Sequence, residues 1–166
     1  MSRAFVKEDS QQEPIRIPPR ASLPGGATNY VTPQGLKQLH QEKEALETEK
    51  AQLALDDEDE LRRQITFLNG KLQLLQDRID SARKIDPQAQ PQDEVRFGAT
   101  VTLELQDAHK TRQFQIVGVD EADFEKQKIS FLSPIAQALS GSKAGDIATL
   151  ELGKEERSFK VLEITY

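Results

Sequence analysis

The sequence contains no cysteine and no tryptophan, and its only histidines are His40 and His109. Without cysteine the chain can form no disulfide, no thiolate nucleophile and no thiolate metal site, and two histidines are too few for a histidine-rich metal centre. Any metal would have to be a hard cation held by oxygen ligands. We therefore expect both histidines to be ordinary surface residues, and we expect no cofactor.

Long apolar runs and an excess of positive charge are also missing. No run of about 18 apolar residues could span a bilayer, and the first residues, MSRAFVKEDSQQEP, lack the apolar stretch of a secretory signal. The sequence thus predicts a cytoplasmic protein without membrane association. The net charge is −6, whereas nucleic-acid binding depends on Lys and Arg neutralising phosphates. We expect no autonomous DNA or RNA binding, and a protein partner instead.

Catalytic signatures are absent from the sequence. It has no phosphate-binding glycine loop, no Gly-x-Ser-x-Gly nucleophile and no zinc-binding pattern, so we expect no enzymatic activity of its own. Apolar residues make up 36% and charged residues 30% of 166 residues, which is little material for one large core. This composition favours a small domain beside an elongated part.

The N-terminal 29 residues combine scattered prolines, the Gly25-Gly26 pair and scattered charge. No sustained apolar period runs through them, so residues 1–29 are predicted to be a disordered tail. One interpretation is an inert extension. The other is a short docking peptide around Phe5-Val6 or around Ile15-Arg16-Ile17.

Residues 30–86 predict an antiparallel coiled-coil hairpin. Thr32 can cap a helix in which Pro33 takes the first position, and this first arm runs to about Ala54. Apolar residues recur every seven residues in the first arm, with one further step of three, and at steps of four and three throughout the second, the spacing of a coiled-coil seam. They are Leu36, Leu39, Leu46 and Leu53 in the first arm, and Leu61, Ile65, Leu68, Leu72, Leu75, Ile79 and Ala82 in the second. Lys43 and Lys50 also occupy seam positions, from which their long stems reach solvent.

Five consecutive acidic residues separate the two arms: Asp56, Asp57, Glu58, Asp59 and Glu60. Their mutual repulsion keeps them out of a seam, and acidic residues suit the N-terminal end of a helix, so the chain should reverse here. One interpretation of this acidic tip is a solvated helix start. The other is that exposed carboxylates, foremost Asp56, Asp57 and Asp59, assist a Mg²⁺ ion held by a partner, with no metal of the chain's own.

A proline-containing linker, residues 87–95, precedes a C-terminal domain at 96–166. Apolar residues alternate at strand spacing in about five short segments, and Ser133-Pro134 begins one short helix. The alternating residues are Val101, Leu103 and Leu105; Phe114 and Ile116; Ile129 and Phe131; Ile147 and Thr149; and Phe159 and Val161, with Ile164 and Tyr166 beyond a local shift. The fold class is therefore α+β, with the helix packed on an antiparallel sheet.

Several stretches from Tyr30 onward resemble the Gre family of bacterial transcript-cleavage factors, GreA and GreB. The matching stretches are YVTPQGL at 30–36, NGKL at 69–72, LQDRI at 75–79, ARKID at 82–86, FGATV at 97–101, IVGVDEA at 116–122, ISFLSPIAQAL at 129–139 and Gly145-Asp146. The combination of Gly-x-Asp-Glu-Ala with Ser-Pro-Ile-Ala-x-Ala-Leu is specific.

The resemblance implies both an architecture and a partner. It implies a coiled coil that enters the secondary channel of bacterial RNA polymerase, and an FKBP-like domain that docks on the channel rim. In the family the loop of the Ser-Pro-Ile-Ala motif contacts the rim, and this role carries over to Ser133, Pro134 and Ile135. We expect a monomer that regulates transcription elongation.

The chain departs from the family at the tip. Members that stimulate transcript cleavage carry an Asp-Leu-Ser-Glu-Asn type motif there, which is absent here, and both arms are two or three turns shorter. The resemblance therefore indicates a divergent member, and a regulator of elongation is favoured over a stimulator of cleavage. Two alternatives stay open: a self-associating coiled-coil adaptor that pairs through Phe67 and Leu74, and a prolyl isomerase, suggested by the FKBP-like fold.

Overall fold

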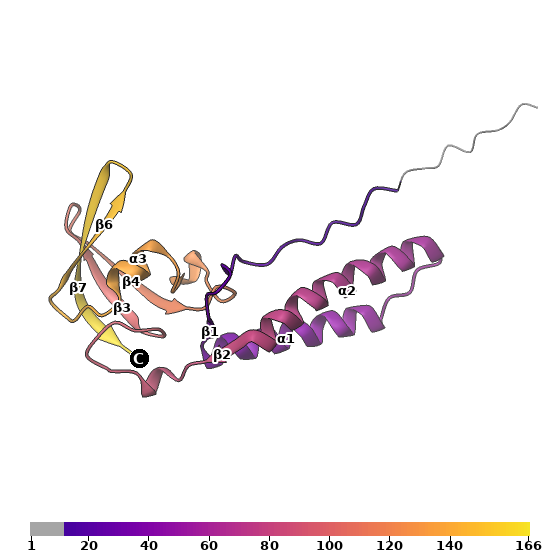
Figure 1. The fold of residues 1–166 in the computed structure, drawn as a ribbon, viewed down its shortest axis with the longest axis horizontal. Coiled ribbons are helices and arrows are strands. Elements are labelled where there is room, and N and C mark those ends of the chain that lie inside the picture. The colour runs from indigo at the N-terminus through magenta and orange to yellow at the C-terminus, as the bar shows by residue number, and fades with distance from the viewer. Residues whose placement is uncertain (1–11) are drawn as a thin grey trace, which may run out of the picture.

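The computed structural model describes residues 12–166, so the Phe5-Val6 docking hypothesis lies outside the described residues. These residues form a pair of helices joined at one end to a C-terminal domain of mixed helix and sheet (Figure 1). The helical pair is α1, Pro33–Ala51, and α2, Glu58–Ser81. The mixed α and β class expected from the sequence is confirmed.

The start of α1 agrees with the sequence prediction. The Thr32 hydroxyl oxygen accepts a hydrogen bond from the Gly35 N–H at 2.9 Å, and Pro33 takes the first helical position, where no N–H is needed. The helix ends at Ala51, a few residues before the expected end near Ala54. A loop of residues 52–57 then leads to α2.

The buried contact between the two helices is narrow. Its buried leucines are Leu39 and Leu46 of α1 and Leu68 and Leu75 of α2. Partly buried residues at its margin are Leu36, Leu53, Phe67, Leu72, Ile79 and Ala82. The side chain of Lys43 is 36% exposed and lies 3.9 Å from the Glu47 carboxylate, so its charge stays in solvent as expected.

Two short parallel strands close the base of the helical pair: β1, Asn29–Val31, and β2, Ala82–Lys84. The buried Asn29 side chain donates to the Arg78 carbonyl at 2.9 Å, and the Ile85 N–H donates to the Val31 carbonyl at 2.9 Å. The sequence prediction missed both strands, because three residues are too few to show a period. Ala82, expected in the helical seam, therefore begins a strand.

The C-terminal domain is built on a five-stranded sheet with the order β5-β4-β3-β7-β6. Its elements are β3, Thr100–Leu105; β4, Lys110–Val117; β5, Lys128–Ser130; α3, Pro134–Leu139; β6, Ile147–Leu152; and β7, Glu155–Thr165. All neighbouring strands are antiparallel except β4 and β5, which are parallel. The five predicted strands and the predicted short helix are confirmed, but the predicted antiparallel arrangement is wrong for one pair, because β5 lies parallel to β4.

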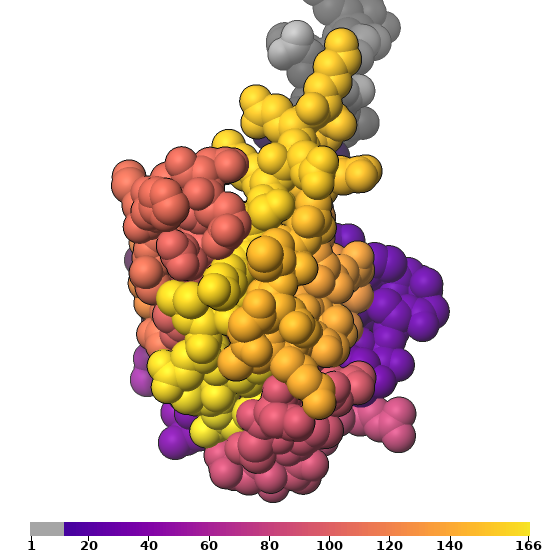
Figure 2. Space-filling view, turned by 90° about the vertical axis from the view of Figure 1, so that its left-hand side faces the viewer, coloured from indigo at the N-terminus to yellow at the C-terminus, as the bar shows by residue number. Residues whose placement is uncertain are grey.

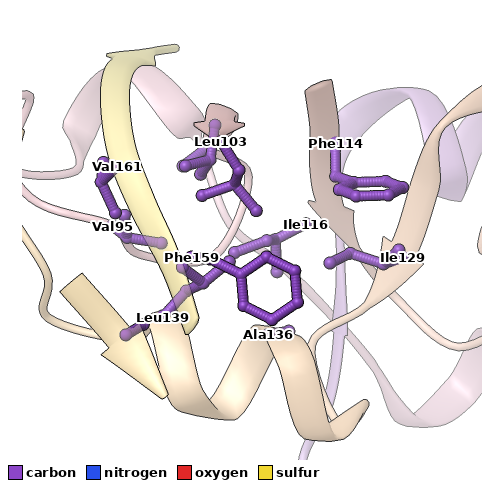
Figure 3. Packing of buried hydrophobic residues seen from close by; sticks show 12 residues of the cluster. Val95, Leu103, Phe114, Ile116, Ile129, Ala136, Leu139, Phe159 and Val161 are labelled. Atoms are coloured by element: carbon purple, nitrogen blue, oxygen red, sulfur yellow. The ribbon is translucent and has the colours of Figure 1, made fainter. Parts of the chain in front are cut away.

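The core of this domain lies between the sheet and α3. Ala136 and Leu139 of α3 face Phe159 and Val161 of β7 and Ile116 of β4 (Figure 3). Val95 is fully buried in the same core, although the sequence places it in the linker 87–95. The domain core therefore begins inside the predicted linker, whose first residues form a 3₁₀ turn, Pro87–Ala89.

The local shift expected in the last strand is a β-bulge. Thr102 pairs with Glu163, whereas Leu103 pairs with Val161, so Leu162 has no partner and is 41% exposed. The bulge explains how Val161 and Ile164 both face the core although they are three residues apart.

The predicted phase of β6 is wrong. Ile147 is 60% exposed, and Ala148 and Leu150 face the core instead. Residues directly opposite in antiparallel strands point to the same face, and Ala148 pairs with the buried Phe159. Cross-strand pairing therefore decides the phase. The turn between β6 and β7 projects from the top of the domain (Figures 1 and 2).

Within residues 12–166, no helix has both the length and the apolar character needed to cross a membrane.

Candidate functional site

The acidic tip lies at the end of the helical pair that is far from the C-terminal domain (Figure 1). Asp57 caps α2: its Oδ1 accepts hydrogen bonds from the Asp59 N–H at 2.9 Å and the Glu60 N–H at 3.1 Å. Asp56 and Glu58 are exposed. The tip is therefore an ordered helix start that presents carboxylates to solvent.

The tip does not assemble a metal site by itself. In the described part of the chain, no three carboxylate or imidazole groups are grouped closely enough to hold a metal ion. Asp59 lies 4.0 Å from the Arg62 guanidinium, and Glu60 accepts a hydrogen bond from the Gln64 amide at 2.9 Å. Any role in metal chemistry would need a metal supplied by a partner.

The second predicted site is the start of α3. The Ser133 hydroxyl oxygen accepts a hydrogen bond from the Ala136 N–H at 3.4 Å, and Pro134 follows as the first helical residue. Pro134 is exposed, but Ile135 is half-buried and packs against the domain core. Of the three predicted contact residues, Pro134 is thus the most accessible, and a charged residue at Ile135 would disturb the fold. The two predicted sites lie in separate parts of the molecule: α3 belongs to the C-terminal domain, and the acidic tip lies at the far end of the helical pair (Figure 1).

The joint between the helical pair and the C-terminal domain is a third cluster, which sequence reasoning missed. Arg20 donates two hydrogen bonds to the Glu42 carboxylate, at 2.7 and 3.0 Å, and one to Asp120 Oδ1 at 3.0 Å. Arg78 Nε lies 3.1 Å from Asp120 Oδ2, within ion-pair distance but without hydrogen-bond geometry. The Asp120 side chain is only 7% exposed, and the N-terminal segment and α2 meet the C-terminal domain at this carboxylate. Helix α1 joins the cluster through Glu42, which pairs with Arg20.

The Arg20 guanidinium is held in its charged form. Its hydrogen bonds to Glu42 raise the pKa of Arg20 above its ordinary value, although partial burial opposes the shift. When folding raises the pKa of a basic group, the charged group stabilises the folded protein. This stabilisation is lost only when the pH rises through the raised pKa of the folded state. The ion pairs of Arg20 should therefore persist through the neutral and moderately alkaline range.

Glu121, the residue after Asp120, makes a second polar contact at the joint. The Thr32 hydroxyl donates to the buried Glu121 carboxylate, which also lies 3.2 Å from the Lys128 ammonium. A Cβ added at Gly35 would lie 2.6 Å from Glu121 Oε2, and one at Gly118 would lie 2.4 Å from the Tyr30 carbonyl oxygen. The Gly-Val-Asp-Glu-Ala motif at 118–122 therefore forms the domain side of the joint. This motif was the one part of the joint that stood out in the sequence, whereas nothing in the sequence pointed to Arg20.

The N-terminal segment lies along α2 over the part that the structure describes (Figure 1). The Arg63 guanidinium donates to the Glu13 carbonyl at 3.2 Å, Ile17 lies against Gly70, and the Arg78 guanidinium donates to the Ala21 carbonyl. Residues 12–28 form no helix or strand, as expected of a tail, but they make specific contacts that a free tail would not make. Disorder of residues 1–29 as a whole stays a prediction.

A cavity of about 490 Å³ adjoins the joint. Its aromatic lining consists of Tyr30, Phe97 and Phe131, whose ring centroids lie 5.5 to 5.8 Å apart. Tyr30 comes from β1, outside the C-terminal domain. The cavity therefore belongs to the contact between the two parts of the chain. His40 and His109 are exposed and lie outside these clusters.

Comparisons with known proteins identify similar chains. The family model described as transcription elongation factor, GreA/GreB, C-term, matches residues 90–166. The transcription elongation factor GreA of Halorhodospira halophila is 42% identical over 106 residues, which are 63% of this chain and 67% of that protein. GreA of Ralstonia nicotianae is 39% identical over 111 residues, 66% of this chain and 70% of that protein.

Matches among solved structures include the transcription elongation factor GreA/GreB from Nitrosomonas europaea. It is 20% identical, with a TM-score of 0.41 over 90% of this chain and 100% of that one. Gfh1 of Thermus thermophilus is 22% identical, with a TM-score of 0.40 over 82% of this chain and 98% of that one.

Proposed function

Because this chain belongs to the GreA/GreB family of transcription elongation factors, we propose that it binds bacterial RNA polymerase and regulates elongation through the secondary channel. The observation that carries the proposal is the family match over residues 90–166, which coincides with the five-stranded C-terminal domain. That domain, which we take to be FKBP-like, docks on the rim of the channel. The helical pair, which we take to be a coiled coil, points its acidic tip into the channel.

Docking through α3 is supported by the exposure of Pro134 at a capped helix start. Pro134 has a fixed φ and no N–H, so it offers a rigid surface whose ordering on binding loses little entropy. Ser133 holds this start through its cap, and Ile135 anchors it to the core. Pro134 is accordingly the residue with which we expect the polymerase rim to make contact.

The Pro134→Glu variant is expected to bind RNA polymerase about ten-fold or more weakly, because it places a charge in the centre of the docking contact. The fold should survive, since Pro134 is exposed and an acidic residue suits the first position of a helix. The measurement is a titration of core polymerase with each variant. Thr111→Glu, which adds the same charge at an exposed position of β4, is the control and should bind like the wild type.

The reach of the tip limits what it does in the channel. The arms contain 19 and 24 residues. Arms shorter by two or three turns withdraw the tip by roughly 11 to 16 Å, whereas a carboxylate ligand must lie about 2 to 2.5 Å from Mg²⁺. A domain fixed on the rim therefore keeps the carboxylates short of the catalytic metal. We infer that the chain occupies the channel and modulates elongation without strongly stimulating cleavage.

The wild-type protein is expected to stimulate cleavage of backtracked RNA weakly or not at all. Changing Asp56, Asp57 and Asp59 together to Asn should alter its effect on elongation more than its effect on cleavage. Asn caps a helix as well as Asp does, so the start of α2 should persist while its charge is removed. The assay uses a stalled elongation complex at saturating factor. Strong Mg²⁺-dependent cleavage that the triple change abolishes would place this chain among the cleavage factors.

The two alternatives have less support. The adaptor hypothesis needs Phe67 and Leu74 to be available to a second chain, but in the structure both line grooves shared with this chain's own residues 13–23. The isomerase hypothesis needs an aromatic pocket in the C-terminal domain, but the aromatic cavity also requires Tyr30 of β1. We therefore favour a monomeric, cytoplasmic accessory factor with no enzymatic activity of its own.

A further inference from the structure

We propose that residues 13–23, here named the strap, hold the helical pair and the C-terminal domain in one fixed relative orientation, with Arg20 joining the two. The inference concerns the free protein and does not depend on binding to RNA polymerase. The sequence predicts only a disordered tail here, whereas the strap has a mechanical role.

The strap matches α2 in length and direction. Its contacts progress from Glu13 at Arg63, through Ile17 at Gly70, to Ala21 at Arg78. Fifteen residues of helix between Arg63 and Arg78 rise about 22 Å, and eight residues of extended chain with polyproline geometry span about 25 Å. The two segments can therefore run side by side in register. Pro14, Pro18 and Pro19 favour that extended conformation before any contact forms, which lowers the entropy lost on docking.

Ile17 occupies a notch that exists because residue 70 is glycine. A Cβ at position 70 would lie 2.5 Å from Ile17 Cδ1 and 2.6 Å from Ile17 Cγ1. Glycine in the middle of a helix lowers helix stability relative to alanine, so local helix formation does not account for it. Ile17 of the strap occupies the space that the missing side chain leaves.

Arg20 joins the strap to both parts of the molecule. It forms a two-pronged hydrogen-bonded pair with Glu42 of α1 and also donates to Asp120, which precedes β5 in the C-terminal domain. Arg78 of α2 lies against the other oxygen of Asp120. Two guanidinium groups and two carboxylates thus balance in charge at the joint. Loss of Arg20 would leave the nearly buried Asp120 with one ion-pair partner and no hydrogen bond from the strap.

The absence of cysteine from the sequence makes the proposal directly testable. Spin labels are attached to Glu49→Cys on α1 and Gln113→Cys on β4, both exposed positions, and the distance between them is measured by pulsed electron spin resonance on the full chain. The doubly labelled wild type should give a single narrow distance distribution. Arg20→Ala and Gly70→Ala should each give a broad distance distribution instead. The first removes the contacts of Arg20 with Glu42 and Asp120, and the second displaces Ile17 from α2.

The matched control is Arg16→Ala, which removes an exposed arginine of the strap that makes no ion pair within residues 12–166. It should retain the narrow distribution. Circular dichroism establishes that each variant is folded. If Arg20→Ala unfolds, Arg20→Lys replaces it in the distance measurement, because lysine keeps the charge but cannot form the two-pronged pair with Glu42. Narrow distributions in the folded Arg20 and Gly70 variants would overturn the proposal, whether or not the chain binds polymerase.

Discussion

The Leu75→Ala variant is expected to lower the free energy of unfolding by about 2 to 5 kcal/mol. Leu75 is fully buried in the narrow contact between α1 and α2, and that contact contains few other buried side chains. Truncation removes apolar burial and leaves a cavity that a two-helix contact has little material to fill. Chemical denaturation followed by circular dichroism measures the change.

Leu74→Ala is the matched control, because it removes the same atoms from the neighbouring residue of the same helix. Leu74 is 36% exposed, so we expect a loss of about 1 kcal/mol or less. Equal losses in the two variants would contradict the assigned helical seam.

The Gly118→Ala variant is expected to be destabilised by about 1 to 3 kcal/mol, mainly at the joint between the helical pair and the C-terminal domain. The added Cβ would lie 2.4 Å from the Tyr30 carbonyl oxygen, which is backbone and cannot move away by a change of rotamer. Either β1 or the 118–122 turn must shift, which separates Asp120 and Glu121 from Arg20 and Thr32. Thermal unfolding and amide hydrogen exchange at β1 measure the effect.

The control for this variant is Gly25→Ala, where no heavy atom lies within 4 Å of the added Cβ. Its stability should equal that of the wild type or slightly exceed it, because alanine restricts the unfolded chain more than glycine does. A Gly118→Ala protein as stable as Gly25→Ala, with unchanged exchange at β1, would show that the close approach at the joint is not required.

The features predicted well from the sequence are those determined by local chemistry. The Thr32 cap with Pro33 and the Ser133 cap with Pro134 act within one helical turn, so the residues themselves define where α1 and α3 begin. The bulge near Leu162 was visible because it changes the apolar spacing of a strand from two to three.

The features that could not be predicted depend on pairing between distant residues. The phase of β6 is decided by Phe159 opposite Ala148, and the pairing of β1 with β2 joins segments about fifty residues apart. Arg20 lies in a proline-containing segment without period, 100 residues from Asp120, so no local pattern indicates their contact. The Gly-Val-Asp-Glu-Ala motif marked one side of the joint but not its partner.

We propose that this member of the GreA/GreB family binds bacterial RNA polymerase through its C-terminal domain. The most direct test is size-exclusion chromatography of core polymerase mixed with increasing amounts of the full chain, with the Pro134→Glu variant run in parallel. We expect the wild type to co-elute with polymerase up to a saturating ratio of about one to one, and the variant to elute mainly free. Wild-type chain that elutes free at every ratio would contradict the claim.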